Sequence, residues 1–453
     1  MISKLQLMQI KNFTTLIKRG ITPKYTEENG TLVINQRCIR HSKIDLSLAR
    51  KHNTSLRAIS SDKLLQKYDV LVNSTGVGTL GRVSQYLDND SITVDSHVTI
   101  IRPDLTKVDP LYFGFLIRNC QDRIESLAEG STGQTELSRI SLGDLDLNFI
   151  DDKIVQQKIG RFLYNLDRKV WLNEEINSTL KSISQTIFNS WFINFDVVRA
   201  KAAALENDLD PLFAGMQEIS GKTKEELQLI SDENYQSLTA TTNLFPDEFE
   251  ETKYGQIPKG WKWMPLYSTA EYVNGCSFKS KDFSTDKSGL PIIKIAELKA
   301  GIAHQTKFTN AEVKAKYAID NGSLLYSWSG SPETSLEVFK WFGGKGWLNQ
   351  HIFLINTSSL SQKAYVFNLL THMKPVLIDV AKNKQTTGLG HVTVADMKRI
   401  HVAVPDENGL KAITEYLVPL YQMDSNNTLQ NENLKQQRDT LIPKLLSGEL
   451  EIN

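Results

Sequence analysis

Two stretches of this chain repeat one helical pattern 254 residues apart, and this repeat constrains the fold more than any other feature. In both stretches, alternating steps of four and three residues select mostly apolar side chains, as in a heptad. Each series is interrupted at the same steps by two asparagines. The selected residues are Ile159, Leu163, Leu166, Val170, Asn173, Asn177, Leu180, Ser184, Ile187 and Trp191 in the first stretch, and Ile413, Leu417, Leu420, Asp424, Asn427, Asn431, Leu434, Arg438, Leu441 and Leu445 in the second.

Apolar residues at this spacing require a partner helix, and a buried polar residue in such a seam fixes the register at a cost in stability. Ordinary amphipathic helices also show this spacing. Matched asparagines at a constant offset make a chance likeness a poor explanation. The sequence therefore predicts two long helices that pair with each other.

The blocks that precede the two helices repeat as well. At the offset of 254, the matching segments are residues 69–76 with 323–330, 95–98 with 349–352, and 112–117 with 366–371. One inserted residue moves the match of Thr132 with Thr387 to an offset of 255. A repeat of this length is one structural unit used twice rather than a short-period solenoid.

Within the first block, β-rich runs predict strands at residues 32–34, 70–72 and 98–101, and a helical run covers residues 111–118. The second block repeats this layout. The predicted fold class is α+β, with two similar domains separated by two long, antiparallel, paired helices and related by an internal pseudo-twofold duplication.

At 453 residues, the chain is longer than one hydrophobic core usually serves, so several domains are expected. Residues 194–255 are interpreted as a solvated linker with one or two short helices. The predicted divisions are a first block (1–150), a first helix (151–200), an acidic linker (201–255), a second block (256–405) and a second helix (406–453).

The net charge is zero, but the charge is unevenly distributed. Residues 1–150 carry 19 Lys and Arg against 16 Asp and Glu, and residues 256–405 carry 18 against 10. Residues 201–255 carry 4 against 12. Basic blocks joined by an acidic segment suit a protein whose blocks face phosphate, although a surplus this mild is weak evidence.

No stretch approaches the roughly 18 apolar residues of a membrane span, and the N-terminus has no apolar run behind a basic flank. We therefore expect the protein to stay in the cytoplasm. Cys38, Cys120 and Cys276 are widely spaced and form no CxxC pair. They predict buried thiols rather than a disulfide framework or a zinc site.

The sequence lacks the motifs of DNA-modifying and DNA-cleaving enzymes. An amino-type DNA methyltransferase needs a turn with two adjacent prolines, which this chain does not contain, and no Gly-rich turn of the dinucleotide-binding type is present. The glycines at residues 343–346 lack phosphate-loop spacing and predict a hairpin turn. Acid–lysine triplets at 297–299 and 312–314 do not repeat between the blocks, and the histidines show no ligand pairing. We predict no catalytic residue, metal site or cofactor in this chain.

Two polar, glycine-containing turns recur in both blocks: residues 73–76 match 327–330, and 130–135 match 385–390. Such turns can hold phosphate oxygens or read base edges. Gly, Ser and Thr also form ordinary tight turns, and composition alone favours that interpretation. His97 and His351 stand at equivalent positions, where a structural role and a groove-facing role both remain open.

Further motifs connect the blocks to the helices: residues 142–145 and 397–400 after the Thr-Gly turns, 156–159 at the first helix start, 194–201, 257–261, and 441–450 near the C-terminus. Together with the duplication, these residues resemble the specificity subunits of type I restriction-modification enzymes. The likeness spans nearly the whole chain. The first block lacks the Pro-x-Gly-Trp start of the second, and the second helix begins without Glu-Gln-Lys, which leaves the block boundaries open by several residues.

The resemblance implies a DNA-binding subunit of a restriction system with no catalysis of its own. Each block would be a target-recognition domain that reads one half of a split, asymmetric target in double-stranded DNA. The paired helices would act as a coiled-coil spacer. They would dock two modification subunits, which bind S-adenosylmethionine, and restriction subunits of the translocase and nuclease type.

The spacer length agrees with this expectation. A helix of 33 residues, from Ile159 to Trp191, is about 50 Å long at roughly 1.5 Å per residue. Domains held that far apart suit half-sites about one DNA turn apart, since a turn is roughly 34 Å.

Candidate DNA-contacting residues are chosen by chemistry, with Arg and Gln for base edges and Ser, Thr and Lys for phosphate. They are Arg37, Asn73, Ser74, Thr75, Arg82, Gln134 and Arg139 in the first block, and Lys279, Lys294, Ser327, Trp328, Ser329, Lys345 and Thr387 in the second. Two alternatives stay open. A self-contained DNA-modifying or DNA-cleaving enzyme would act on DNA by itself, whereas a coiled-coil protein scaffold would lack salt-dependent DNA affinity.

Overall fold

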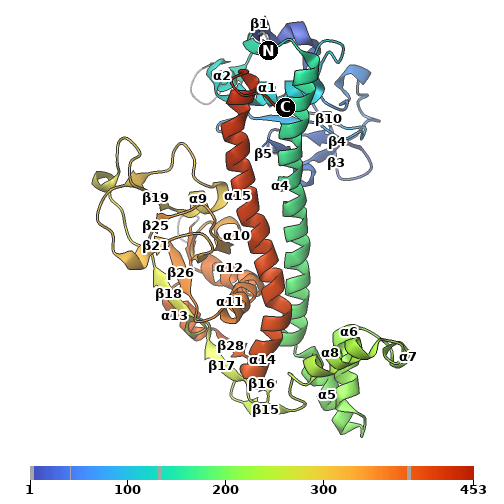
Figure 1. Ribbon diagram of the computed structural model, residues 1–453, viewed down its shortest axis with the longest axis vertical. Helices are drawn as coiled ribbons and strands as arrows, with labels where there is room; N and C mark the ends of the chain where they lie inside the picture. Colours follow the sequence, from blue (N-terminus) through green and yellow to red (C-terminus); the bar gives the residue numbers. More distant parts are fainter. Residues whose placement is uncertain (1–4, 41, 131–134, 385–388, 453) are drawn as a thin grey trace. The chain divides into compact units, whose positions relative to one another are not determined.

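A computed structural model describes residues 5–40, 42–130, 135–384 and 389–452. The chain divides into two units whose boundaries fall within its long helices. Met1–Val170 and Asn433–Asn453 form the first unit, and Trp171–Glu432 forms the second. We call the strands and helices from Leu5 to Ile150 head 1, and those from Lys262 to Val404 head 2 (Figure 1).

Head 1 contains an antiparallel sheet and a mixed sheet. The antiparallel sheet has the order β2 (Thr14–Arg19), β11 (Val98–Pro103), β8 (Val70–Asn73), β9 (Val83–Gln85). The mixed sheet has the order β10 (Thr93–Val94), β4 (Thr31–Ile34), β7 (Arg50–His52), β3 (Tyr25–Thr26). Separate strand pairs are β1 (Leu5–Gln9) with β14 (Asp146–Ile150), β5 (Ile39–Arg40) with β6 (Lys43–Ile44), and β12 (Ala128–Glu129) with β13 (Glu136–Leu137). The helices are α1 (Pro110–Asn119), α2 (Gln121–Ser126) and α3 (Arg139–Gly143).

The central strand of head 1 is buried on both faces, and its successive residues divide between two cores. Val70 and Val72 of β8 pack in one cluster with α1. Leu71, which lies between them, packs on the opposite face with Ile34 and Val94. Because successive strand side chains point to opposite faces, an unbroken apolar run is expected in such a doubly covered strand.

Head 2 repeats this arrangement. Its antiparallel sheet has the order β18 (Glu271–Asn274), β26 (Ile352–Asn356), β22 (Leu324–Ser327), β24 (Glu337–Lys340). Its mixed sheet has the order β20 (Phe308–Thr309), β19 (Leu290–Ile293), β25 (Gly346–Leu348), β21 (Ala318–Ile319). Separate pairs are β17 (Lys262–Pro265) with β28 (His401–Val404) and β23 (Ser329–Gly330) with β27 (Gly390–His391). The helices are α9 (Ile295–Ala300), α10 (Pro332–Ser335), α11 (Leu360–His372), α12 (Lys374–Lys382) and α13 (Val394–Arg399).

The structure confirms the predicted duplication. The central strands β8 and β22 begin and end at residues exactly matched by the offset of 254, and each occupies the same place in its sheet. A parallel strand pair also occurs at the same place in each head, β10 with β4 and β25 with β19. The shift to an offset of 255 is visible where β14 begins at Asp146 and β28 at His401.

The long helices are α4 (Lys153–Phe188) and α15 (Val418–Leu446), and they run antiparallel in each unit (Figure 1). Both predicted helices are therefore confirmed, and each differs from a continuous α-helix at one end. The last turn of the first is a π-helical turn, η4 (Asn189–Ile193), and the second is preceded by α14 (Glu407–Ala412) and a π-helical turn, η8 (Ile413–Leu417).

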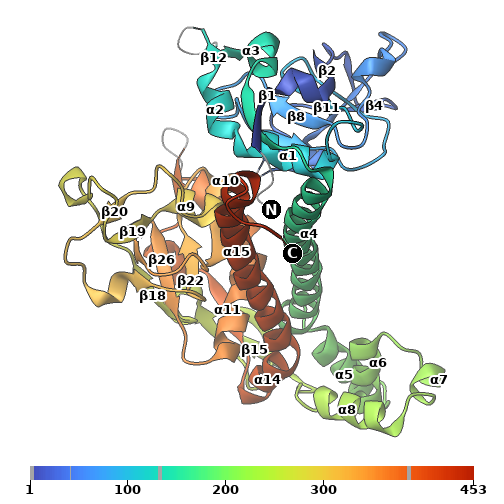
Figure 2. The same cartoon turned by 45° about the horizontal axis from the view of Figure 1, so that its top comes forward.

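The segment predicted to be a solvated linker with one or two short helices has more structure than expected. It contains α5 (Asp196–Glu206), α6 (Pro211–Ser220), α7 (Lys224–Leu227) and α8 (Asp232–Thr242), followed by the hairpin of β15 (Phe249–Thr252) and β16 (Gly255–Pro258). Figure 2 shows α5, α6 and α8 gathered together. Met216 and Leu227 are buried, and the buried Lys201 donates hydrogen bonds to the carbonyl oxygens of Thr242 and Phe245. A few apolar residues thus hold this acidic segment together.

Residues 343–346 do not form the predicted hairpin turn. β24 and β25, which they connect, belong to different sheets. Gly344 adopts a φ of 78°, and its carbonyl oxygen accepts a hydrogen bond from Trp341 Nε1 at 2.6 Å. These glycines therefore lie in the connection that crosses from the sheet of β24 to the sheet of β25.

The prediction of buried thiols is confirmed for Cys38 and Cys120 and only in part for Cys276. Cys38 and Cys120 are buried, Cys276 is half-buried, and none forms a disulfide. Across the described ranges of the chain, no helix is both long and apolar enough to cross a membrane.

Candidate functional site

The asparagines of the helix seam meet in reciprocal pairs in the second unit. Asn173 Nδ2 donates to Asn431 Oδ1 at 2.8 Å, and Asn427 Nδ2 donates to Asn177 Oδ1 at 2.9 Å. The repeat offset of 254 relates Asn173 to Asn427 and Asn177 to Asn431, so the repeat converts the first pair into the second. The seam therefore has a local pseudo-twofold relation at this point.

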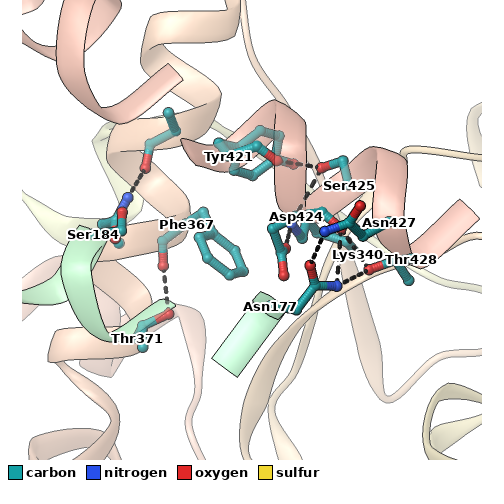
Figure 3. Close-up of polar contacts among 12 residues, drawn as sticks. Asn177, Ser184, Lys340, Phe367, Thr371, Tyr421, Asp424, Ser425, Asn427 and Thr428 are labelled. Atoms are coloured by element: carbon teal, nitrogen blue, oxygen red, sulfur yellow. Dashed lines mark hydrogen bonds and ion pairs between the residues drawn. The ribbon is translucent and has the colours of Figure 1, made fainter. Parts of the chain in front are cut away.

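Additional hydrogen bonds surround these amides, although Asn173 Oδ1 is buried without a hydrogen-bond partner among the described residues. Asn173 also donates to Gln430 Oε1 at 2.8 Å. Asn177 Nδ2 lies 3.2 Å from the carbonyl oxygen of Asp424 and 3.1 Å from Thr428 Oγ1, and Figure 3 shows Asn177 pointing toward Asn427 and Thr428. Amides paired in this way fix the helix register, because a slip would leave buried polar groups without partners.

Predicted seam positions are buried or half-buried throughout both helices, and none is exposed. In the first unit, Ile159 and Leu163 share a core with Leu445, and Leu166 and Leu441 pack against it. In the second unit, the core includes Ile413 and Leu417, with Ile187 packed against it. The remaining predicted pairing residues, Leu180, Leu420 and Leu434, are also at least half-buried.

A buried ion-pair network joins head 1 to both helices in the first unit. Asp167 of α4 accepts from Arg118 of α1 at 2.7 Å and from Arg438 of α15 at 2.6 Å. All three side chains are 15% exposed or less. Because an unpaired buried charge is costly, this network strongly favours one position of head 1 on its helix pair.

Head 2 is joined to α15 by different residues. Lys340 of β24 forms an ion pair with Asp424, and its ammonium lies 3.2 Å from Ser425 Oγ (Figure 3). The Lys340 ammonium also lies 4.5 Å from the centre of the Tyr421 ring and 5.1 Å from that of Phe367. Each head therefore contributes a buried cation to a helix carboxylate, although the positions do not correspond in the repeat.

The recurring polar turns converge in head 1. Ser74, which follows β8, donates its N–H to the His97 carbonyl at 2.8 Å and accepts from the Leu137 N–H at 2.9 Å. Thr75 forms an antiparallel bridge with Glu136, and its hydroxyl lies 2.7 Å from His97 Nδ1. The end of the central strand is thus held between His97 and the segment that follows the Thr-Gly turn.

Head 2 has the same backbone connections. Trp328 donates its N–H to the His351 carbonyl at 3.3 Å and accepts from the Val392 N–H at 2.9 Å. Ser329 pairs with His391. The recurrence of all three connections shows that the two turns form one equivalent site in each head.

Side chains at these equivalent sites differ. In head 1, Arg19 forms an ion pair with Glu136. In head 2, the Trp328 ring centre lies 5.5 Å from that of His351 and 6.0 Å from that of His391. Burial, reinforced by His391, lowers the pKa of His351 below its usual range. One site therefore carries an ion pair, and the other carries packed aromatic rings.

The predicted DNA-contacting residues fall into groups by accessibility. Arg37, Arg139, Lys279 and Lys345 are exposed, and Thr75, Arg82, Lys294 and Trp328 are half-buried. The buried candidates are Asn73, Ser74, Ser327 and Ser329. Gln134 and Thr387 lie outside the described residues.

Burial changes the role of four of these candidates, because a side chain without exposed surface cannot touch a duplex. Asn73 Nδ2 donates to the carbonyl oxygens of Gln36 and Thr79, and the Ser74 hydroxyl lies 2.5 Å from Thr99 Oγ1. In head 2, Ser327 is 0% exposed and Ser329 is 6% exposed. These residues support the turns from within instead of presenting them to a ligand.

The other candidates lie at separate points of the heads. Arg82 Nη2 donates to the Gly78 carbonyl at 2.8 Å, which ties it to the turn after β8. Lys294 Nζ lies 5.4 Å from the centre of the Phe283 ring. Arg139 begins α3, directly after the cap residue Ser138. In each head, the structure brings together the two recurring polar turns, whereas the predicted basic residues do not form one cluster with them.

Sequence reasoning missed Glu136 and His391. The offset of 255 aligns them, and that signal was available after the Thr-Gly match. The residue types gave no hint, because a glutamate and a histidine share little chemistry. Their equivalence becomes evident only from the bridges to Thr75 and Ser329.

The model of the type I restriction modification DNA specificity domain matches residues 3–182 and 258–436, which is well over half of the chain. The chain belongs to this family. The match occurs once over head 1 and the first part of the seam, and once over head 2 and the second part.

Known members of the specificity family align over most of this chain. The type I restriction enzyme HindI specificity subunit of Haemophilus influenzae is 29% identical over 409 residues, which are 86% of this chain and 88% of the relative. The MjaIX specificity subunit of Methanocaldococcus jannaschii is 21% identical over 361 residues, 78% of this chain and 71% of the relative. The crystal structure of an S subunit from M. genitalium has a similar fold, with a TM-score of 0.52, 14% identity and coverage of 100% of this chain and 97% of that one.

Membership in the specificity family decides between two of the interpretations left open by the sequence. Specificity subunits are the DNA-recognition components of restriction-modification systems and are not catalytic. A self-contained modifying or cleaving enzyme is therefore not the appropriate interpretation. The predicted fold class, with two similar domains and two long helices, is confirmed.

Proposed function

We propose that this specificity protein reads a bipartite, asymmetric DNA target, with one half-site for each head. The observation that supports it most directly is the pair of equivalent sites at Thr75–Glu136 and Ser329–His391. Their backbones have the same connections, while their side chains differ in charge and shape. Two readers built on one scaffold but carrying different side chains fit a target with two different halves.

Exposed basic residues supply further contacts to DNA. Arg37 and Arg139 of head 1 are candidates for base edges, and Lys279 and Lys345 of head 2 are candidates for contacts to the DNA backbone. Backbone contacts position a protein on the duplex without reading its sequence. Thr75 and Trp328 lie at the turns that read base edges, and Gln134 and Thr387 remain candidates for the same role.

The paired helices act as the spacer and as the docking surface for two modification subunits, with restriction subunits joining the assembly. This proposal is supported by the family and by the reciprocal asparagine pairs, which give the two helices equivalent surroundings at Asn173 and Asn427. S-adenosylmethionine binds to the modification subunits rather than to this chain.

The test is to co-express this chain with the modification subunits and to map methylated bases over the whole genome of the host. We expect one two-part motif with a fixed gap, absent when this chain is omitted. A continuous motif, or none, would contradict the proposal. In a second arm, residues 1–150 are exchanged for the corresponding block of another family member, and only one half of the motif should change.

A further inference from the structure

Glu136 and His391 occupy the same backbone position in the two heads, which we call the bridge position. Glu136 bridges to Thr75 and His391 to Ser329, directly after the central strand of each head. The next residue in each head donates its N–H to the carbonyl oxygen of the turn, at 2.9 Å in both cases. This position can change its side chain while the surrounding backbone stays the same.

In head 1, this position presents a hydrogen-bond acceptor. The Glu136 side chain is 58% exposed, so a ligand can reach it. Arg19 Nη1 donates to Glu136 Oε1, and Arg19 Nη2 donates to the Leu137 carbonyl at 2.8 Å, which fixes the carboxylate next to the turn. An ionised carboxylate only accepts hydrogen bonds, so it suits the exocyclic amino group of cytosine or adenine and is unsuited to the acceptors of guanine and thymine.

In head 2, the same position presents an imidazole against a tryptophan. Trp328 Nε1 donates to Asn274 Oδ1 at 3.0 Å, which holds the indole ring beside His391. Nδ1 of His391 is buried and has no hydrogen-bond partner within the described ranges of the chain. An outside partner therefore reaches this imidazole through Nε2, which donates or accepts according to the tautomer. Its chemistry differs from that of a carboxylate.

We propose that this bridge position sets which base each head reads: Glu136 recognises the exocyclic amino group of cytosine or adenine in one half-site, and His391 selects a base in the other. The inference rests on the proposed reading of a bipartite target and names the residues that choose the bases. It explains how two heads with one fold recognise two different half-sites.

The experiment uses the full chain assembled with its modification subunits and compares the methylated motif of variants. Glu136→Gln keeps the side-chain size and adds an N–H₂ donor. We expect the preference for cytosine or adenine at one position of one half-site to fall by about tenfold or more, because a single good base contact contributes that much discrimination. His391→Gln should change one position of the other half-site and leave the first unchanged.

Matched controls are Asp122→Asn in head 1 and His304→Gln in head 2, since both side chains are exposed and lie outside the bridges. Their motif should equal that of the wild type. Thermal melting followed by circular dichroism checks the fold of each variant. Should Glu136→Gln fail to fold, Glu136→Ala, which removes the acceptor without adding a donor, is expected to relax the same position.

The outcomes separate this inference from the function on which it rests. If the wild type methylates a two-part motif and folded Glu136 and His391 variants keep that motif unaltered, the bridge position does not choose bases and the inference is wrong. A change in both half-sites from one substitution would also overturn it. If the wild type methylates no two-part motif, the proposed function itself fails.

Discussion

Asn177 accepts a hydrogen bond from Asn427 and donates toward Thr428 and the Asp424 carbonyl. Asn177→Ala removes these bonds and leaves the amide of Asn427 without its partner in a half-buried seam. A buried polar group left unsatisfied costs about 1–3 kcal/mol. We expect the free energy of unfolding to fall by this amount, measured as a lower midpoint in urea denaturation.

The matched control for Asn177→Ala is Ser178→Ala on the next, exposed position of α4. Alanine is a good helix former, so this variant should unfold at or slightly above the wild-type midpoint. Equal midpoints for the two variants would show that the asparagine pair contributes nothing to stability.

The asparagines also show what the sequence predicts at the scale of residues. Their place in the seam follows from helical periodicity, which is a local property of the chain. The burial of Asn73 and Ser74 does not, because it depends on Gln36, Thr79 and Thr99, which lie in other parts of the head. Helical periodicity therefore locates the asparagines of the seam, whereas residue type alone does not show that Asn73 and Ser74 of the turn are buried.

His351 makes the stability of head 2 dependent on pH. Burial, with a contribution from His391, lowers its pKa from 6.5 in the folded protein. The unfolded chain then binds a proton more readily than the folded one, so stability is present above about pH 6.5 and declines as the pH falls through the lower, folded pKa. Burial shifts the pKa of His372 in the same direction.

We expect His351→Gln to weaken this pH dependence, because glutamine does not titrate. Melting temperatures of the variant and the wild type measured between pH 7.5 and pH 5 provide the test. The variant should lose less stability over the acid half of that range, with His372 still responsible for part of the loss. Parallel curves would show that His351 does not titrate differently on unfolding.

At the scale of elements, the first turns of α4 are fitted closely against head 1. Gln156 Nε2 donates to the Ile150 carbonyl at 2.6 Å, and its Oε1 accepts from the Asp109 N–H at 2.8 Å. A Cβ at Gly160 would lie 2.5 Å from the backbone nitrogen of Tyr112 and 2.8 Å from Asp109 Oδ1. The helix therefore touches the N-terminus of α1 through a residue without a side chain.

Gly160→Ala tests this close contact. In an exposed helix the change would stabilise by about 1 kcal/mol. Here the added methyl group meets backbone atoms that cannot move independently, and overpacking of this kind costs about 1–3 kcal/mol. We expect a net loss of unfolding free energy in urea denaturation, whereas Ser182→Ala on the exposed face of α4 should cause little change. A more stable Gly160→Ala protein would contradict the packing described.

The folded segment of α5 to α8 shows why sequence reasoning about elements was incomplete. Its acidic composition indicated a solvated surface, and most of its residues are indeed exposed. Its helices begin at capping residues, since Asp210, Thr223 and Ser231 each accept a hydrogen bond from a backbone N–H of the following turn. What the sequence did not show is that the sparse apolar residues, such as Met216, meet in one small core.

At the scale of the whole molecule, the duplication was predictable because an internal repeat compares the chain with itself. The offset of 254 located both central strands and the seam. The parallel pairing of β10 with β4 was not predictable, because the segment that joins these strands contains β5 to β9, and no local pattern shows which strands pair. Local pattern thus located the elements, while their pairing depended on contacts across the chain.

The proposed spacer can be lengthened without breaking its seam. A copy of residues 164–170 inserted after Val170, together with a copy of residues 434–440 inserted after Asn433, adds one heptad to each antiparallel helix. Each copied segment carries one half of the Asp167–Arg438 pair, so the added turns can form the same ion pair. Seven helical residues extend a helix by about 10 Å at roughly 1.5 Å per residue. We expect the gap between half-sites to grow by about three base pairs at roughly 3.4 Å each, with the bases of both half-sites unchanged.

Inserting the heptad into α4 alone provides the contrast. It shifts α4 by about two turns relative to α15 on one side of the insertion, so the helix pairing at either the reciprocal asparagines or the Asp167–Arg438 pair is lost. This variant should be less stable and should lose the defined gap. Methylated motifs from the paired and single insertions, mapped with the same modification subunits, decide the point. If the paired insertion left the gap unchanged, or altered the bases of a half-site, the helices would not be the element that measures the distance.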